Sequence, residues 1–493
     1  MRFTKFVLPA WVATGLLAAS AATAADSTLP SRIDPNLYAQ LAQNTPAAPV
    51  LPAVPEEDAY QMRALPPQEA AQEASAEEGP NRYLEIEPLT SRGINTYGWI
   101  DAGIGANNWG SPFNGPITFN DRNWQGQMNQ LYLVNERLLD VDGGRNFGGR
   151  VDLLYGTDYI YTTARGLDAN LLNQANVAGV TGAPSWASSK DYGLAMPQLY
   201  GEVGAANHAV KFGHFYTIIG YEVVPAIGNF FYTHAYTMQY GEPFTHTGIL
   251  DTWTPNDQLI VYGGITNGWD NFSDPINILG IANPGYPGAN SNAAFLGGVT
   301  FKSSDAKQAL TTAVSSGNEI GSFSPTGLGN IGNRSVVSTV YINELTDKVT
   351  YVFQNDLGWQ FNANPVSQNI GQANGLAQWY GINQYMFYTF SDTLIGGMRL
   401  EWFRDNNGYR VVNPIRNLIY GGPYGSGYAG NFWQVTWGLN WKPNRNVIVR
   451  PELRYDFYSP DNMKGPLPFG KITGGSGDQY GQLYGGCDAI WQF

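Results

Sequence analysis

Few residues of this chain combine the types and spacings that catalysis requires. The four histidines, His208, His214, His234 and His246, include no pair at the helical spacing that holds zinc in metalloproteases. The sequence contains neither the Gly-x-Ser-x-Gly turn of serine hydrolases nor a phosphate-binding Walker loop. A single cysteine, Cys487, permits no disulfide framework and no cysteine-based zinc site within one chain. We therefore expect no enzyme activity, no catalytic residue and no cofactor.

One weaker constellation could hold a metal ion. His234 and His246 flank Glu242 in a segment that we expect to be a loop. Three potential ligands in a loop are weak evidence for a metal site. A loop histidine more often forms an ordinary hydrogen bond than binds a metal ion. We therefore expect no metal site.

Charged side chains at every second residue indicate a different chemistry, the filtering of ions or solutes. Facing charges of opposite sign set the selectivity of pores. The simpler alternative for the same residues is a set of cross-strand ion pairs. The pore-lining candidates are Arg150, Asp152, Arg399, Glu401, Arg450, Glu452, Arg454 and Asp456.

These charges need elements that hold them on one face. Between residues 433 and 441 every second side chain is apolar, and the residues between them are polar or glycine. Segments 147–155, 398–403 and 447–456 alternate in the same way, with the charged candidates on the polar side. A period of two residues places the two sets on opposite faces of a β-strand.

The composition favours strands that lie between lipid and water. Charged residues make up only 14% of the 493 residues, while hydrophobic residues make up 43% and aromatic residues 14%. An ordinary soluble domain has about a quarter charged residues. After the N-terminal stretch, no segment approaches the roughly 20 apolar residues of a spanning helix, so an exported chain of this kind can span a membrane only as a closed barrel. The net charge of −13 argues against a nucleic-acid partner and gives a mild expectation of cation preference.

The N-terminal region differs from the rest of the chain. Arg2 and Lys5 precede a short apolar stretch that ends in the small residues Ala22-Thr23-Ala24, as in a signal peptide cleaved after Ala24. An uncleaved membrane anchor is the alternative, although the stretch is short for that role. The following segment is rich in Pro, Ala, Gln and Glu and nearly free of aromatics, which is typical of a flexible linker. We therefore expect a signal peptide (1–24), a flexible periplasmic leader (25–92) and a barrel domain (93–493).

Short and long connections alternate along the barrel domain. Outer-membrane barrels place short turns on the periplasmic side and long loops outside. The pattern therefore predicts an all-β fold, a single large antiparallel transmembrane β-barrel of about 16 strands, within a range of 14–18. The short turns are expected near 142–146, 205–207, 255–257, 303–307, 345–347, 391–393 and 442–445. The long loops are expected near 108–127, 160–194, 220–245, 268–291, 318–333, 360–377, 406–430 and 458–478.

Aromatic residues on the apolar faces predict a membrane girdle. The chain ends on Phe493, and a terminal aromatic on a closing strand resembles the signal by which barrels are recognised for insertion. In a soluble fold the same aromatics would instead pack a core. The girdle candidates are Trp433, Trp437, Trp441 and Trp491.

A long loop folded into the lumen would narrow the predicted pore. The segments 160–194 and 220–245 are the candidates. Aromatic residues beside polar groups in the second segment could form a sugar-stacking track, although packing of the loop against the wall is the simpler role. The constriction candidates are Tyr221, Glu222, Tyr232, His234 and Tyr236.

Six short segments carry a further signal. They are Tyr97–Gly103, Phe119–Arg122, Leu131–Arg137, Lys211–Tyr216, Gly220–Glu222 and Asp488–Ile490. These segments resemble the bacterial outer-membrane β-barrel porin family described as OmpL-like, and the likeness covers most of residues 93–493. The resemblance implies a barrel and a porin function, and it brings no catalytic residues. It also implies pore or turn positions for Asp101, Glu136, Arg137, Lys211 and Glu222.

The sequence therefore predicts a bacterial outer-membrane porin that lets small hydrophilic solutes or ions diffuse passively through a water-filled barrel. Its expected partners are outer-membrane lipid, the solutes themselves and the barrel assembly machinery, and its size is compatible with a homotrimer. One alternative is a sugar-selective or anion-selective channel of the same fold. Others are a plugged structural or adhesive barrel and a soluble secreted β-protein that binds carbohydrate.

Overall fold

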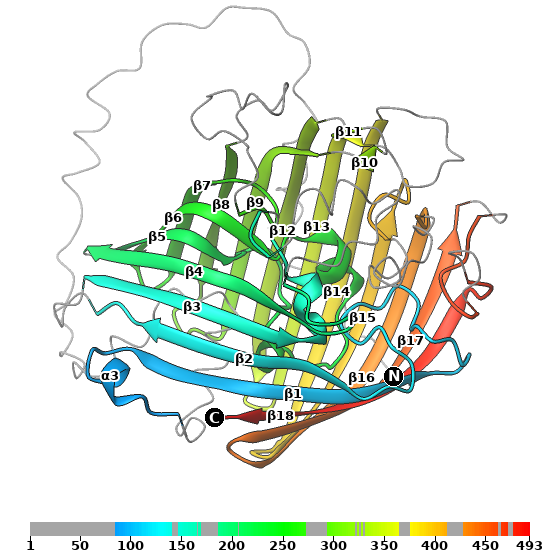
Figure 1. Ribbon diagram of the computed structural model, residues 1–493, viewed down its shortest axis with the longest axis horizontal. Coiled ribbons are helices and arrows are strands. Elements are labelled where there is room, and N and C mark those ends of the chain that lie inside the picture. The colour runs from blue at the N-terminus through cyan, green and yellow to red at the C-terminus, as the bar shows by residue number, and fades with distance from the viewer. Residues whose placement is uncertain are drawn as a thin grey trace, which may run out of the picture. The chain divides into compact units, whose positions relative to one another are not determined.

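The alternating segments form sixteen antiparallel strands that close into one barrel (Figure 1). A computed structural model describes residues 84–140, 146–164, 166–168, 186–205, 207–272, 293–320, 323–324, 327–328, 331–363, 375–411, 427–461, 465–471 and 477–493. The predicted signal peptide and residues 25–83 of the predicted leader lie outside the described residues. So do the turn residues 142–145 and most of the segment 165–185.

Each strand pairs with its neighbours in the chain, as in an up-and-down barrel. The predicted all-β fold and strand number are therefore confirmed. The strands are β1 (Asn95–Asn107), β2 (Gln127–Arg137), β3 (Phe147–Gly156), β4 (Gly193–Ala205), β5 (His208–Tyr216), β6 (Thr245–Asn256), β7 (Leu259–Thr266), β8 (Ala294–Lys302), β9 (Gln308–Ile320), β12 (Ile331–Thr346), β13 (Val349–Ala363), β14 (Gly375–Ser391), β15 (Leu394–Asp405), β16 (Gly430–Asn444), β17 (Val447–Pro460) and β18 (Gly481–Gln492).

The first and last strands complete the ring. β1 and β18 run side by side in antiparallel register, with Trp99 opposite Gln492 and Asn107 opposite Tyr484. Beyond β18, the main-chain N–H of Phe493 donates to the Gly98 carbonyl at 2.9 Å, and the Gly98 N–H donates back at 2.9 Å. Closure pairs the strand edges, which hydrocarbon would otherwise leave without hydrogen-bond partners.

The connections alternate in length as predicted. The described short turns join β4 to β5, β6 to β7, β8 to β9, β12 to β13, β14 to β15 and β16 to β17. One long connection is shorter than expected: β9 continues to Ile320 and β12 begins at Ile331, with the small strands β10 (Phe323–Ser324) and β11 (Gly327–Leu328) paired between them. Polar and glycine residues there suggested a loop, but the pairing of β9 with β12 continues to Ile320 and Ile331.

A one-turn helix precedes the barrel. This helix, α3 (Glu87–Thr90), begins with an acidic residue and a proline, which favour a helix start. It lies in the last part of the segment that we predicted as leader. No helix among the described residues has the length and apolar character needed to cross a membrane.

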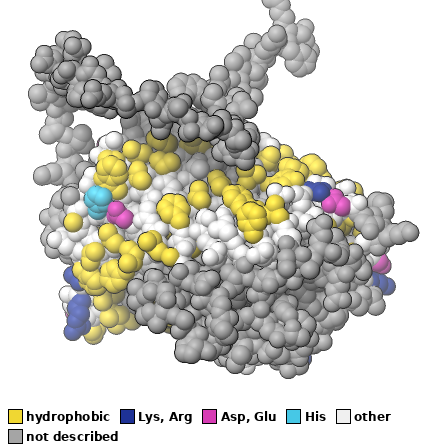
Figure 2. All heavy atoms as spheres, turned by 90° about the horizontal axis from the view of Figure 1, so that it is seen from above, with side chains coloured by type: hydrophobic (Ala, Val, Ile, Leu, Met, Phe, Trp, Pro, Cys, Tyr) yellow, Lys and Arg dark blue, Asp and Glu magenta, His cyan; other side chains and the backbone are white. Residues whose placement is uncertain are grey.

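The two faces of each strand differ as their parity predicts. Along β16, Trp433, Trp437 and Trp441 point outward and are about half exposed, whereas Gln434 and Thr436 are buried inside. Trp491 on β18 is also outward, beside the ring of Phe493. Hydrophobic side chains spread over the described part of the face in Figure 2, with few charged groups among them. This outward surface suits lipid contact.

Candidate functional site: the lumen and its inward loop

The segment between β5 and β6 folds into the barrel and fills much of its middle. This segment, residues 217–244, is named the inward loop. It contains a short 3₁₀ turn, Ala226–Gly228, and a π-helical turn, Thr237–Gly241. Gly220 has a φ of +87° and lies against the Glu242 carboxylate, so a side chain at this position would meet both strain and a clash. The glycine thus allows the chain to turn back on itself where the loop leaves β5.

An arginine on β15 anchors the start of the inward loop. Arg399 is fully buried, and its Nη1 donates to Glu222 Oε1 at 2.6 Å and to the Thr233 carbonyl at 2.7 Å. Glu222 also accepts hydrogen bonds from the Ala235 N–H and the Tyr385 hydroxyl. Phe231 lies 4.9 Å from the guanidinium carbon. One guanidinium therefore holds two points of the loop, at Glu222 and at Thr233, against the wall.

A second arginine on β17 binds the turn at Ala226–Gly228. Arg450 Nη1 donates to the carbonyls of Ala226 at 2.9 Å and Asn229 at 2.8 Å. Its opposite edge forms an ion pair with Asp488 of β18, and Asp101 of β1 lies 4.0 Å away. Because Asp488 neutralises Arg450, the remaining donors of this guanidinium can bind the loop carbonyls without leaving an unpaired buried charge.

A third arginine, also on β17, holds the π-helical turn. Arg454 Nη1 donates to the His234 carbonyl at 2.6 Å, and its Nε donates to Asp456 at 2.9 Å. The Tyr236 hydroxyl donates to the same carboxylate at 2.6 Å, and its ring lies 4.9 Å from the Arg454 guanidinium carbon. Arg454, Asp456 and Tyr236 thus form one buried hydrogen-bonded network. Removal of any of these three side chains would leave a buried polar group without a partner.

Two buried carboxylates on the same wall accept main-chain N–H groups of the loop. Glu401 binds the N–H groups of Tyr236 at 2.8 Å and Thr237 at 2.7 Å, at the start of the π-helical turn. Glu452 accepts the Thr233 N–H at 3.1 Å. A loop inside a barrel has no neighbouring strand for its backbone, and these carboxylates supply the missing acceptors.

The other two charged candidates, Arg150 and Asp152, lie away from the arginines and carboxylates that hold the inward loop. On β3, Arg150 Nε donates to Asp152 Oδ1 at 2.7 Å, and Asp152 also accepts the Tyr132 hydroxyl at 2.6 Å. Arg150 forms a longer pair with Glu136 at 3.3 Å. The described geometry therefore gives this pair a role in the wall, separate from the arginines that hold the inward loop.

The opposite side of the lumen combines apolar side chains with small hydroxyl groups such as Thr300, Thr311 and Ser338. Inward side chains of β6, β7, β8 and β12 include Leu250, Ile260, Leu296 and Val336, all buried. They belong to one hydrophobic cluster that reaches Ile219 of the inward loop and aromatic residues of β14–β16. The loop is thus held by charges on one side and by apolar contacts on the other.

The inward loop also contacts residues at the extracellular side. The Tyr240 hydroxyl donates to the Pro116 carbonyl at 2.5 Å, and Trp379 Nε1 donates to the Gly241 carbonyl at 3.0 Å. Gln354 Nε2 donates to Glu242 Oε1 at 2.5 Å. Burial and the neighbouring Asp356 raise the pKa of the Glu242 carboxyl well above its ordinary value. These contacts fix the end of the loop that returns to β6.

Electrostatics keep the main anchor charged. Burial alone would raise the pKa of Glu222, but Arg399 and hydrogen bonds from His234 and the Ala235 N–H hold it at about 2. Burial lowers the pKa of His234, so this histidine is neutral at pH 7. The anchor between Glu222 and Arg399 is therefore an ion pair across the physiological pH range.

The structure brings together most of the candidates that the sequence indicated. Six of the eight charged candidates touch the inward loop or its partners, and all five loop candidates lie in that loop. Tyr221 packs on Tyr385 at 4.9 Å, and the Tyr232 hydroxyl donates to Asn129. Their aromatic rings contact the wall, as the simpler interpretation of this segment proposed.

Several partners were not identified from the sequence. Asp488, Gln130, Asn129, Thr233 and Gln434 each bind the loop or one of its arginines. Parity could have assigned Asp488 and Gln434 to the inward face, because they alternate with apolar neighbours. It could not have assigned both Asn129 and Gln130, which are adjacent at a register shift in β2. No local pattern indicates which loop atom each would meet.

The histidines of the weaker metal pattern have separate roles. His234 Nδ1 lies 3.3 Å from Glu222 Oε2, whereas His246 lies 3.0 Å from Thr217 Oγ1 through Nε2 and 3.0 Å from the Gly268 carbonyl through Nδ1. Within the described ranges, no group of three potential ligands is arranged around a metal position.

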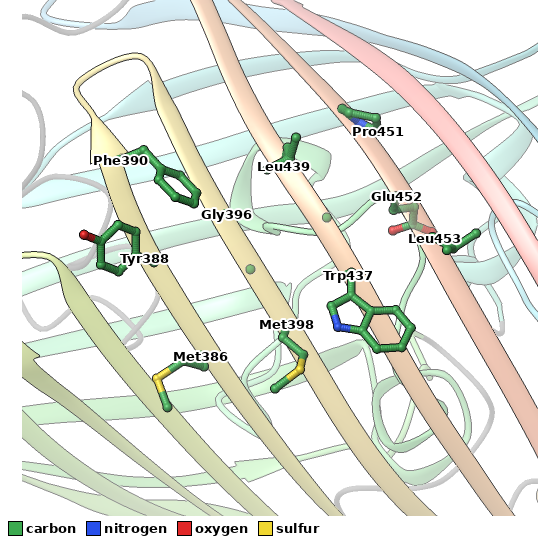
Figure 3. Close-up of a pocket in the computed structure, with 12 residues that line it drawn as sticks. Met386, Tyr388, Phe390, Gly396, Met398, Trp437, Leu439, Pro451, Glu452 and Leu453 are labelled. Carbon is green, nitrogen blue, oxygen red and sulfur yellow. The ribbon is translucent and has the colours of Figure 1, made fainter.

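The outward face of β14–β17 has an apolar hollow behind the loop (Figure 3). Its sides include Tyr388, Phe390, Trp437 and Leu439. On the inner side of the same wall, Phe230 packs on Gly397 and Phe231 on Gly438. A side chain would clash with the ring at Gly397 and would be tightly crowded at Gly438. The strands therefore carry no inward side chain at Gly397 and Gly438. The rings of Phe230 and Phe231 occupy the space that such side chains would take.

The barrel domain matches a known protein family. The family model described as "Putative beta-barrel porin-2, OmpL-like" matches residues 93–493. Solved structures with a similar fold include the outer membrane channel DcaP of Acinetobacter baumannii, at 9% identity over 81% of this chain and 97% of that chain, with a TM-score of 0.48. OprB of Pseudomonas putida is 12% identical over 82% of this chain and 96% of that one, also with a TM-score of 0.48. No curated protein matches the chain in sequence.

The anchor at Glu222 predicts a large effect of one substitution. Arg399→Gln leaves Glu222 buried without its cation, and we expect a loss of about 3–5 kcal/mol in the free energy of unfolding. Denaturant unfolding of the refolded barrel measures this loss, and protease cleavage within residues 217–244 reports release of the loop. Arg404→Gln is the matched control because its ion pair with Asp461 is partly exposed and contributes below about 1 kcal/mol. Equal stability of the two variants would refute the anchor.

The same ion pair predicts a pH dependence. The pKa of Glu222 is about 2 in the folded barrel, below its ordinary value near 4.3. The stabilisation by this carboxylate is therefore complete above about pH 4.3 and is lost as the pH falls through about 2. Unfolding free energies measured from pH 7 to pH 2 should show this loss in the native protein and a smaller change in Glu222→Gln. Parallel pH profiles for the two proteins would contradict the assignment.

Proposed function

Because the chain belongs to the family described as "Putative beta-barrel porin-2, OmpL-like", we propose that it is an outer-membrane porin whose inward loop restricts the passive diffusion of small hydrophilic solutes or ions. The closed sixteen-stranded barrel gives the membrane-spanning wall. The proposal assigns the control of passage to residues 217–244, which occupy the middle of the lumen.

One observation supports this restriction more than any other. Arg399, Arg450 and Arg454 each donate to a main-chain carbonyl of the inward loop, at 2.6–2.9 Å. Charge-assisted hydrogen bonds from buried guanidinium groups are among the stronger contacts in proteins. The loop is therefore a fixed part of the pathway, and the fixed charges beside it would act on any ion that passes.

A plugged barrel with a structural or adhesive role is the second candidate. The observation in its favour is the hydrophobic cluster that joins both sides of the lumen through Ile219, Tyr236 and Tyr240. A wide water-filled pore would not bury inward side chains so completely. The two functions differ in whether solute crosses the native protein, which conductance can decide.

Single-channel recording in a planar bilayer tests the channel. We expect a small ohmic conductance for the native protein and a severalfold larger one for the double variant Arg399→Gln/Arg454→Gln, because the loop loses two of its anchors. Arg404→Gln should conduct like the native protein. A silent native protein with a conducting double variant would favour the plugged barrel, and silence of all three would reject the channel.

Export and the absence of chemistry complete the proposal. We propose cleavage of a signal peptide after Ala24, a periplasmic leader up to residue 92, and insertion by the barrel assembly machinery through β18 and the aromatic Phe493 that follows it. We also propose that the protein has no enzyme activity. Mass spectrometry of the mature N-terminus would show the cleavage point.

We further propose a homotrimer, formed through the outward face of β9, β12 and β13. Register places Thr312 beside Thr339, and Thr339 beside Asn355, on this face. The Thr312 and Thr339 hydroxyls lie 3.1 Å apart, and Ser316 and Ser335 form a second pair at 2.7 Å. A row of hydroxyl and amide groups suits a protein neighbour better than hydrocarbon.

Light scattering in mild detergent measures the assembly. We expect a mass of three copies for the native protein and of one copy for Thr339→Arg, since the added charge would face its symmetry mates. Val435→Arg, on the outward face of β16, controls for an arginine placed on another part of the surface. An unchanged mass in Thr339→Arg, or a single-copy native protein, would reject this interface.

A further inference from the structure

Two arginines meet on one tryptophan above the inward loop. The guanidinium carbons of Arg334 and Arg410 lie 5.0 and 5.2 Å from the Trp269 ring centre. Arg410 also lies 5.0 Å from the ring centre of Trp379, and the two tryptophans contact edge to face at 6.1 Å. None of these residues was indicated by the sequence patterns. The positive charges of Arg334 and Arg410 therefore lie in one aromatic cluster formed by Trp269 and Trp379.

The cluster lies at the extracellular end of the barrel. Arg334 is near the start of β12, and Arg410 follows the end of β15, both opposite to the short turns. Arg410 Nε donates to the Tyr240 carbonyl, which belongs to the inward loop. The two guanidinium groups therefore lie next to the end of the inward loop, on the side of the lumen opposite to the short turns.

Asp405 fixes the backbone that carries Arg410. Its carboxylate accepts the main-chain N–H groups of Asn407, Tyr409, Arg410 and Val411 at 2.7–3.1 Å. Such hydrogen bonds define a tight turn directly after β15. Arg410 is thus held in place by its backbone as well as by its side chain.

Both guanidinium groups retain hydrogen-bond donors. Arg334 donates from Nε to Gln360 Oε1 at 2.6 Å and from Nη2 to the Tyr409 hydroxyl at 3.2 Å. Arg410 uses Nε for Tyr240, and in the described part of the chain its two Nη atoms make no hydrogen bond. A guanidinium group offers five N–H donors in a planar fork that matches carboxylate and phosphate oxygens.

The two positive charges repel each other. Burial and the Arg334 charge together lower the pKa of Arg410 to about 10, so it stays protonated at pH 7. Asp405 and Asp270 act on Arg410, and a third carboxylate, Glu319, accepts the main-chain N–H of Trp269 at 2.7 Å. Asp405 binds the turn described above, and Asp270 accepts the N–H groups of Phe244 and Thr245. An anion placed at the cluster would relieve the repulsion and use the remaining donors.

We propose that Arg334 and Arg410 form a binding site for the carboxylate or phosphate group of small anionic solutes at the extracellular entrance. The site rests on the proposed channel function, because it would select among the solutes that enter. Sugar stacking fits the cluster less well, since Trp269 and Trp379 are at most 4% exposed and guanidinium groups cover their rings. The tryptophans instead orient the two cations.

Calorimetric titration of the detergent-solubilised full-length barrel with inorganic phosphate tests the site directly. We expect the double variant Arg334→Gln/Arg410→Gln to bind phosphate at least about tenfold more weakly than the native protein, equal to about 1.4 kcal/mol. Arg404→Gln removes a charge from the outer rim and should bind like the native protein. Retention of heat-modifiable mobility on gels shows that each variant is folded.

Bilayer recording with phosphate and then chloride separates this site from the channel itself. Weaker block by phosphate in the double variant, with unchanged block in Arg404→Gln, would support the site in a working channel. Loss of calorimetric binding in the double variant of a non-conducting barrel would support the site and reject the channel. Equal phosphate binding by the native and double-variant proteins would overturn the site, whether or not the barrel conducts.

Discussion

The structure depends on closure of the strand ring between β1 and β18. In hydrocarbon, no water satisfies main-chain N–H and C=O groups, so an open edge would cost several kcal/mol for each exposed group. The reciprocal hydrogen bonds between Gly98 and Phe493 extend that pairing to the last residue of the chain. Once the ring is closed, every inward side chain points into the lumen, and the inward loop and any solute must fit into that same volume.

Buried charge organises that space. In a soluble protein a buried ion pair often contributes little, because desolvation offsets its attraction. Here the arginines of β15 and β17 have a second task, since a loop inside the lumen brings main-chain groups that no strand can pair. Arg399, Arg450 and Arg454 satisfy loop carbonyls, while Glu401 and Glu452 satisfy loop N–H groups. The charged side chains that line the constriction therefore also hold the inward loop in its folded position.

Two kinds of contact hold the inward loop in the lumen. Arginines and carboxylates of β15 and β17 bind its main chain, and one hydrophobic cluster joins Ile219 of the loop to side chains of β6, β7, β8 and β12. Above the loop, Arg410 reaches down to the Tyr240 carbonyl, so the extracellular cluster and the constriction share a contact.

The sequence by itself determined the barrel, the approximate strand number, and which residues face inward or outward. These follow from local geometry, because successive side chains of a strand point to opposite faces and turn residues mark the strand ends. It also placed the eight charged candidates and the aromatic loop in the lumen. Only the tertiary structure decided that Arg399 meets Glu222, or that Arg334 and Arg410 meet at Trp269. Such pairs join distant segments, and the path of a loop inside a ring of strands leaves no periodic trace in the sequence.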